Sequence, residues 1–298
     1  MSISVNRMQY RQLGSSGLII SRIGYGAWPL GGRGWGRHNE RRARTALETC
    51  LELGINFFDT APVYGFGRSE QVLGTALAGI RSKVLLATKC GLVWNDNGQV
   101  RHDLSRDALR RDLEGSLQRL NTDYIDLYQI HWPDRRTPLE ETLDELLGFK
   151  RTGAVRNIGV CNFPAELLQQ ACGLAPVASI QHPYNLLQRD AAEEVLPLCR
   201  ELRLGFIAYS PLAQGVLAGE MSANTRPGLR DIRRRNPLYR DARQYEQAVR
   251  HAAGLPKPAA CTALRFLLEQ PRVTCALVGM TQPEHVKLNM QALEALET

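Results

Sequence analysis

Several classes of protein are excluded by what this sequence lacks. No apolar run among its 298 residues approaches the length of a membrane-spanning helix, and the first seven residues lack the apolar stretch of a secretory signal. The seven cysteines are odd in number and include no Cys-x-x-Cys pair. Buried thiols in a reducing compartment fit this pattern better than disulfides or a metal site. We therefore expect a cytoplasmic protein with no metal ion and no membrane segment.

Positive charge is in excess, but it is concentrated in one part of the chain. The formal net charge is +7, and one late segment holds Arg230, Arg233, Arg234, Arg235, Arg240 and Arg243. No nucleic-acid-binding motif and no interleaved aromatic residues accompany these arginines, so we expect no nucleic-acid partner. The cluster is suited to the phosphate groups of a dinucleotide, or else it is a solvated basic surface.

Short apolar strands alternate with helical stretches along most of the chain. Eight strands are expected to begin near Ile23, Ile55, Val84, Ile125, Val155, Ala178, Gly205 and Thr274. Helices are expected at residues 40–53, 69–78, 106–120, 139–151, 164–172, 191–202 and 259–269. Parallel strands need such helical crossovers. The sequence therefore predicts an α/β fold, a closed (β/α)8 TIM barrel, with residues 1–298 forming a single domain.

Three segments depart from this alternation. Residues 10–20 contain two extended runs around Gly14-Ser15-Ser16-Gly17, which predicts an N-terminal β-hairpin. Residues 31–36 are rich in glycine and are interpreted as a flexible substrate loop. Residues 217–258 form a long loop after the seventh strand, with one extra helix expected at residues 241–252. An open doubly wound sheet is the competing architecture, but the first strand lacks the Gly-x-Gly-x-x-Gly turn that it would need.

Ionisable side chains stand at the ends of three consecutive predicted strands. Asp59 ends the second strand, with Tyr64 on the loop that follows it, Lys89 ends the third strand, and His131 follows the fourth. Because the carboxyl ends of barrel strands meet on one face, these side chains should converge there. Each of them alone is more often a turn, packing or surface residue, so only the combination indicates a site.

These residues resemble the tetrad of the aldo-keto reductase family. The resemblance extends from Leu13 to Asn289 and is carried by five phrases: Asp59-Thr60-Ala61-x-x-Tyr64-Gly65, Thr88-Lys89, Leu120-x-Thr122-Asp123-Tyr124-Ile125-Asp126-Leu127, Ile158-Gly159-Val160-Cys161-Asn162-Phe163 and Tyr209-Ser210-Pro211-Leu212. It implies that Tyr64 is the proton donor and acceptor, with Lys89 lowering its pKa and Asp59 holding Lys89. His131 would orient the substrate carbonyl.

The resemblance also implies a nicotinamide cofactor. Asn162 and Gln181 would bind its carboxamide, Tyr209 would stack on the ring, and Ser210, Pro211, Leu212 and Gly215 would meet the pyrophosphate. Gly279, Gln282, His285 and Asn289 would bind the adenosine end. NADP(H) is favoured over NAD(H), although this chain has no lysine or arginine at the position where NADPH-selective members usually carry one.

The expected activity is that of an NAD(P)(H)-dependent oxidoreductase. It would interconvert an aldehyde or ketone with its alcohol, or a sugar lactol with its lactone, and act as a monomer on a small molecule. Trp28 and Trp132 are expected to line the substrate pocket, unless they are barrel-packing residues. The alternatives are a cofactor-holding regulatory subunit of a membrane or protein complex with little turnover, and an aldolase or isomerase using Lys89 as a Schiff base.

Overall fold

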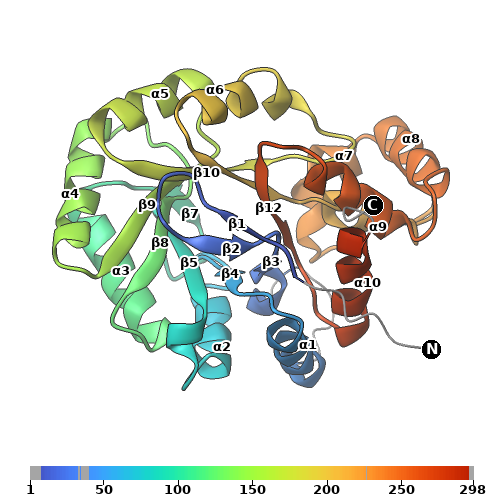
Figure 1. Cartoon of the computed structure of the whole chain (residues 1–298), viewed down its shortest axis with the longest axis horizontal. Coiled ribbons are helices and arrows are strands. Elements are labelled where there is room, and N and C mark those ends of the chain that lie inside the picture. Colours follow the sequence, from blue (N-terminus) through green and yellow to red (C-terminus); the bar gives the residue numbers. More distant parts are fainter. Residues whose placement is uncertain (1–7, 33, 35–39, 226, 295–298) are drawn as a thin grey trace.

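A closed barrel of eight parallel strands forms the centre of the molecule (Figure 1). The computed structural model describes residues 8–32, 34, 40–225 and 227–294. Around the barrel the strands follow in chain order, and the last pairs with the first. They are β3 (Ile23–Gly26), β4 (Phe57–Asp59), β5 (Leu85–Cys90), β8 (Ile125–Ile130), β9 (Val155–Cys161), β10 (Val177–Pro183), β11 (Gly205–Tyr209) and β12 (Val273–Val278). The predicted barrel is confirmed.

Amphipathic helices surround the strands and bury one face each against them (Figure 1). They are α1 (Glu40–Glu52), α2 (Arg68–Ala76), α3 (Arg106–Leu120), α4 (Leu139–Arg151), α5 (Ala165–Leu174), α6 (Val195–Glu201), α9 (Ala259–Leu268) and α10 (Pro283–Glu294). Short 3₁₀ turns add η1 (Trp28–Gly31), η2 (Arg81–Lys83) and η3 (Asp190–Ala192). The prediction of a helix at residues 191–202 is wrong for its first turn. Helix α6 begins only at Val195, because Pro197 is tolerated in a first turn but not in a helix interior.

The predicted N-terminal hairpin is present and closes the amino-terminal end of the barrel. It consists of β1 (Tyr10–Gln12) and β2 (Ile19–Ser21). Between them, Gly14 has a φ of +55°, and a Cβ built on it would lie 2.5 Å from the Ala178 oxygen and 2.6 Å from the Gly205 nitrogen. Ala178 and Gly205 lie at the start of β10 and β11. A side chain at position 14 would therefore push the hairpin away from the barrel.

Two insertions lie near the opposite, carboxyl-terminal end. After β11 comes η4 (Ala213–Ala218), which begins before the predicted loop, and the loop itself contains η5 (Ile232–Arg235), α7 (Pro237–Arg240) and α8 (Ala242–Ala253), beside α9 (Figure 1). Helix α8 is the extra helix predicted there, with Asp241 as its N-cap, accepting hydrogen bonds from two backbone amides. A second hairpin, β6 (Leu92–Trp94) and β7 (Val100–His102), follows β5 and was not predicted.

The barrel interior changes from apolar to polar along its axis. Alternate residues of a strand face the same side, so each strand contributes one residue to a lower layer and another to an upper layer. The lower layer is apolar and includes Phe57, Ala87, Leu127 and Ile207. Two residues further along the same strands lie Asp59, Lys89, Gln129 and Tyr209. The period of two therefore places the chemistry directly above the core.

Candidate active site

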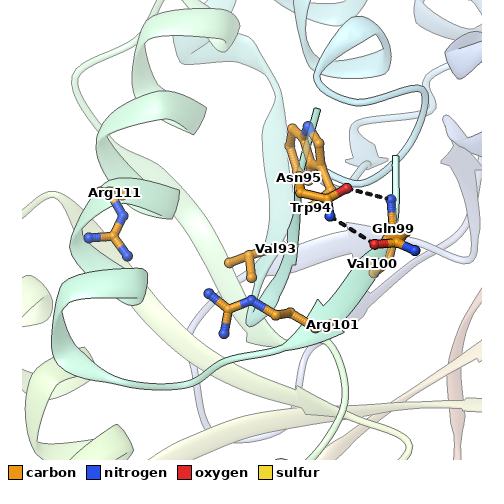
Figure 2. A pocket seen from close by; sticks show the side chains of 7 residues that line it. All are labelled: Val93, Trp94, Asn95, Gln99, Val100, Arg101 and Arg111. Carbon is orange, nitrogen blue, oxygen red and sulfur yellow. Dashed lines mark hydrogen bonds between the residues drawn. The ribbon is translucent and has the colours of Figure 1, made fainter. Parts of the chain in front are cut away.

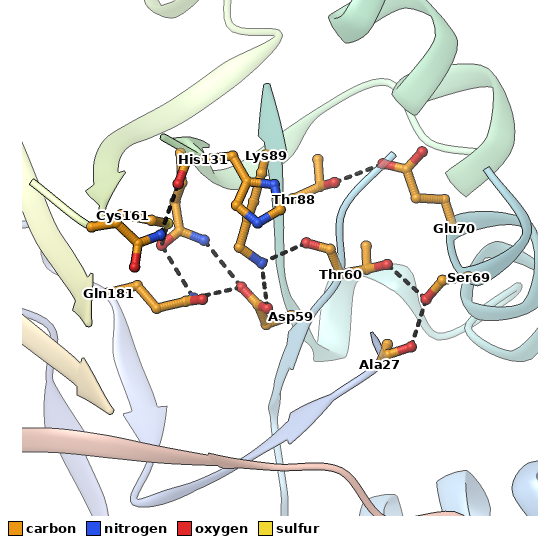
Figure 3. Close-up of polar contacts among 12 residues, drawn as sticks. Ala27, Asp59, Thr60, Ser69, Glu70, Thr88, Lys89, His131, Cys161 and Gln181 are labelled. Carbon is orange, nitrogen blue, oxygen red and sulfur yellow. Dashed lines mark hydrogen bonds and ion pairs between the residues drawn. The ribbon is translucent and has the colours of Figure 1, made fainter. Parts of the chain in front are cut away.

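A buried ion pair occupies the upper layer of the barrel. Lys89 Nζ lies 2.5 Å from Asp59 Oδ1 and donates a second hydrogen bond to the Thr60 carbonyl oxygen at 2.8 Å (Figure 3). Both side chains are almost inaccessible to solvent. Burial, the largest influence, would alone lower the pKa of Lys89, but its interactions with Asp59, Tyr64 and Cys161 together outweigh burial and hold that pKa above its ordinary value. Lys89 is therefore an ammonium ion throughout the neutral range.

Two amides complete the surroundings of the Asp59 carboxylate. Gln181 Nε2 donates to Asp59 Oδ2 at 2.9 Å, and Gln129 Nε2 donates to the same oxygen at 3.0 Å. Gln181 Nε2 also lies 3.4 Å from Gln129 Oε1. The resemblance implies a carboxamide contact for Gln181, whereas in this structure its amide group is directed at Asp59 (Figure 3).

Tyr64 lies above the ion pair on the turn that follows β4. Its ring centroid is 5.2 Å from Lys89 Nζ, and its ring stacks on Trp28 at 5.7 Å and meets the edge of His131 at 5.8 Å. The turn is tight because Gly65, with a φ of +65°, packs against the backbone of Gly31. The loop that carries Tyr64 is thus held by close backbone contact.

The expected low pKa of Tyr64 is not what the surroundings produce. Burial raises the pKa of the phenol to about 12, and the charge of Lys89 acts in the opposite direction without overcoming it. The sequence analysis correctly predicted that Lys89 lowers the pKa of Tyr64. The net result was wrong, because burial by side chains such as Trp28 and His131 depends on tertiary packing.

His131 is neutral in the folded protein. Burial, followed by the nearby charge of Lys89, lowers the pKa of its imidazole well below the usual range. A neutral imidazole carries one N–H donor and one acceptor nitrogen. His131 can therefore donate a hydrogen bond in the cavity without adding a second positive charge.

Asn162 connects His131 to Tyr209. Its Nδ2 donates to the His131 carbonyl oxygen at 3.0 Å, and its Oδ1 accepts from the Tyr209 hydroxyl at 2.8 Å. Asn162 has a φ of +60°, a left-handed conformation that asparagine tolerates better than most residues. The preceding residue, Cys161, is buried, and its Sγ lies 3.7 Å from Gln129 Oε1.

One large cavity of about 1370 Å³ opens above these residues. Asp59, Tyr64, His131 and both predicted pocket tryptophans, Trp28 and Trp132, line it. So do all the residues expected to bind the cofactor, namely Asn162, Gln181, Tyr209, Ser210, Pro211, Leu212, Gly215, Gly279, Gln282, His285 and Asn289. Lys89 lies behind the lining. The cavity exceeds the roughly 300–1,000 Å³ typical of single-ligand pockets, as a dinucleotide and a substrate together require.

The chain after β11 is shaped for a close ligand. Ser210 and Gln214 have left-handed φ values of +53° and +54°, and Gly215 has a φ of +105°. A Cβ on Gly215 would lie 2.9 Å from Met221 Cε. The buried Gln214 Oε1 has no hydrogen-bond partner among the described residues. A strained turn with an unsatisfied polar atom on the cavity fits a polar ligand such as a dinucleotide.

Positive charge forms part of the cavity lining. Gln282 precedes α10 and His285 lies in the first turn of this helix, whose amides favour an anion. Arg42 lines the cavity there and pairs with Glu284 at 3.0 Å. Of the predicted basic segment, the residues that line the cavity are Arg230, Arg233, Arg234 and Arg235. Arg233 is already paired with Asp231, 2.6 Å away.

The β6–β7 hairpin separates the large cavity from a smaller one. Leu92, Asn97 and Val100 line the large cavity. The smaller one, about 500 Å³, is lined by Val93, Trp94, Asn95, Gln99, Val100, Arg101 and Arg111 (Figure 2). Trp94 packs on Phe66 with ring centroids 5.4 Å apart. Half of the glycine-rich segment at residues 31–36 (residues 33, 35 and 36) lies outside the described residues, and of its described half only Gly34 lines the large cavity.

Gln129 and Arg42 are among the site residues that the sequence analysis missed. Gln129 contacts Asp59, and its position on β8, two residues before His131, was the available signal. Arg42 contacts a residue 242 positions away, for which the sequence has no local signal. Among the described residues, no group of three or more metal-ligating side chains comes together. No described helix is long and apolar enough to cross a membrane.

Comparison with known proteins identifies the family. The Aldo/keto reductase family model matches residues 22–297. An aldo-keto reductase of Bacillus subtilis, YhdN, is 38% identical, covering 93% of this chain and 86% of its own. An NADH-specific methylglyoxal reductase of Escherichia coli is 35% identical, covering 94% and 92%. The structure of a glycerol dehydrogenase from Gluconobacter oxydans superposes with a TM-score of 0.82 at 32% identity, covering 97% and 90%. This chain belongs to the aldo-keto reductase family, which uses NAD(P)H and includes oxidoreductases such as the methylglyoxal reductase and the glycerol dehydrogenase.

Proposed function

We propose that this protein interconverts a small aldehyde or ketone and its alcohol, with Tyr64 transferring the proton. The observation that supports this most is the position of Tyr64. It lines the cavity beside neutral His131, while the Lys89 ammonium lies 5.2 Å from its ring, behind the lining. Interconversion of a sugar lactol and its lactone is the same reaction on a cyclic substrate.

The roles of the tetrad follow from charge and position. In carbonyl reduction, the Tyr64 hydroxyl donates its proton to the carbonyl oxygen, and the Lys89 ammonium stabilises the phenolate that remains. The neutral imidazole of His131 donates a hydrogen bond that orients the carbonyl. Asp59 keeps Lys89 in place and compensates its charge. When bound, the nicotinamide supplies the hydride for the carbonyl carbon.

Asn162 and Gln181 are proposed to bind the carboxamide. Gln181 Nε2 is directed at Asp59 and Gln129, so its carbonyl oxygen is the group that remains to accept a hydrogen bond. Tyr209 would stack on the nicotinamide ring, held in position by its bond to Asn162. The Ser210–Gly215 turn and the start of α10 would bind the phosphates.

We propose that NADP(H) is preferred over NAD(H). Arg42, Arg230, Arg234 and Arg235 line the cavity and can neutralise an additional phosphate. Glu284 opposes such a phosphate, but Arg42 pairs with it. The Escherichia coli relative is NADH-specific, so membership of the family does not by itself determine this preference.

The remaining proposals concern the substrate pocket, the domain organisation, the location and the oligomeric state. Trp28 and Trp132 would contact the apolar part of the substrate, because both line the cavity and Trp28 stacks on Tyr64. We also propose that residues 1–298 act as one domain and that the protein is a cytoplasmic monomer.

Two alternatives are not favoured. The tetrad is complete, and Asp59, Tyr64 and His131 line the large cavity with Lys89 behind them, which a regulatory subunit with little turnover does not require. A Schiff-base lysine must be accessible and readily deprotonated. Lys89 is inaccessible, paired with Asp59, and has a pKa above its ordinary value.

The test is a pair of measurements on the purified protein. Tryptophan quenching by NADPH and by NADH gives the two affinities, and a carbonyl panel followed at the nicotinamide absorbance gives turnover. We expect tighter binding of NADPH and turnover that falls by about 10²–10⁴-fold in Tyr64→Phe. Full turnover in Tyr64→Phe would contradict the assigned proton donor.

A further inference from the structure

Gln129 is a polar side chain in a fully buried position of the barrel. It lies on β8, is 0% exposed, and is not among the residues that line the cavity. It therefore does not contact a ligand in that cavity. Burying an amide is unfavourable unless its polar atoms are paired, so its partners indicate its role.

Each polar atom of Gln129 has a partner in the site. Its Nε2 donates to Asp59 Oδ2 at 3.0 Å. Its Oε1 lies 3.4 Å from Gln181 Nε2 and 3.7 Å from Cys161 Sγ. Figure 3 shows the side chain of Gln181 directed at the Asp59 carboxylate. Gln129 is therefore part of the Asp59 environment.

These bonds determine how the Asp59 carboxylate is oriented. Oδ2 accepts from two amides, and Oδ1 accepts from Lys89. A carboxylate held at both oxygens cannot rotate without breaking a bond to a charged group, and such bonds are the stronger ones. Its orientation in turn places the Lys89 ammonium relative to the Tyr64 ring.

We propose that Gln129 is a positioning residue for proton transfer: it holds the Asp59 carboxylate in the orientation that keeps the Lys89 ammonium beneath Tyr64. This inference rests on the proposed role of Tyr64. Without Gln129, Gln181 is the remaining amide donor to Asp59 Oδ2. The carboxylate gains freedom to turn, and the stabilisation of the Tyr64 phenolate weakens.

The effect should appear in the proton-transfer step and not in cofactor binding. Gln181 keeps its shorter bond, the 2.9 Å contact to Asp59, when Gln129 is removed. It therefore still lines the cavity in nearly the same position. Alcohol oxidation needs the Tyr64 phenolate as a base, so a less well placed Lys89 moves that activity to higher pH.

The test is the pH dependence of kcat for alcohol oxidation in Gln129→Met, which retains the volume but removes both hydrogen-bonding groups. We expect kcat near neutral pH to fall by on the order of tenfold. The pH at which kcat begins to rise should be higher than in the unaltered protein. The Kd of NADPH should change little. Ser179→Ala is the matched control, because Ser179 is on the same interior face as Gln181, and its hydroxyl has no hydrogen-bond partner among the described residues. It should leave the pH profile unchanged.

Gln129→Glu provides a second variant that keeps side-chain size. A glutamic acid that retains its proton can donate to Asp59 Oδ2, whereas a glutamate repels it. The rate of carbonyl reduction by Gln129→Glu, divided by the rate of the unaltered protein at the same pH, should be highest at acid pH. This ratio should fall as the pH rises. This comparison decides the matter if Gln129→Met fails to fold.

The outcomes separate this inference from the proposed function. A shifted profile in Gln129→Met, with an unchanged Kd, supports the positioning role. An unshifted profile, or a ratio for Gln129→Glu that does not vary with pH, overturns it while the proposed function stands. If the unaltered protein binds NADPH but Tyr64→Phe is equally active, the proposed function fails and the inference fails with it.

Discussion

Replacing Lys89 with methionine should displace the pH dependence of alcohol oxidation by a predictable amount. The ammonium lies 5.2 Å from the centre of the Tyr64 ring. At an effective dielectric constant of about 20, two unit charges at that separation interact by about 3 kcal/mol, or about two pKa units. Without Lys89, the phenolate of Tyr64 is less stable by that amount. At any pH on the rising part of the profile, the rate should fall about 100-fold.

The assay is kcat/KM for alcohol oxidation measured at several pH values. Lys89→Met alone leaves Asp59 buried without its cation, which typically costs about 3–5 kcal/mol of stability. The matched variant Asp59→Asn/Lys89→Met removes both charges and should recover most of the stability but not the activity. A folded double variant whose pH profile coincides with that of the unaltered protein would refute the argument that Lys89 acts on Tyr64 by its charge.

Three further predictions follow from other parts of the site. His131 stays neutral when folded because its pKa is well below the usual range, whereas in the unfolded chain it gains a proton below about pH 6.5. The unfolded state then binds more protons, so stability falls as the pH drops. In His131→Gln that fall should be smaller, as judged by urea midpoints at acid and neutral pH, and equal falls would contradict this. Gly215→Ala, at a φ of +105°, should lose about 1–3 kcal/mol of unfolding free energy and weaken cofactor quenching. A variant as stable as the unaltered protein would show that the turn is unstrained. Arg42→Ala should weaken NADPH binding relative to NADH, and Glu284→Gln should do the reverse, as measured by two-cofactor titration; an unchanged ratio in both would exclude this ion pair from cofactor choice.

The barrel and the position of the tetrad could be predicted because both depend on local patterns. Apolar runs that alternate with helices imply parallel strands, and the residue at each strand's end then lies on a known face. Asp59, Lys89 and His131 needed no further information to be brought together. The period of two along β8 would also have placed Gln129 beside them, but a lone glutamine in a strand carries no recognisable motif.

Other features depend on contacts that no local pattern specifies. The β6–β7 hairpin consists of two three-residue strands whose turn is held by the Asn95 side chain, which accepts from the backbone amides of Asn97 and Gln99. Strands so short give no clear periodicity. The pKa of Tyr64 depends on how fully its neighbours bury it, which only the folded structure shows. The pairing of Arg42 with Glu284 joins the first and last helices of the barrel.

The most direct test of the account is to follow the hydride. The reduced nicotinamide would be labelled with deuterium at its transferred position, and the alcohol formed by the purified protein would be analysed by mass spectrometry and NMR. The account predicts deuterium on the carbinol carbon in the unaltered protein and almost none formed by Tyr64→Phe in the same time. An alcohol without deuterium, or equal labelled product from both proteins, would contradict hydride transfer with Tyr64 as the proton donor.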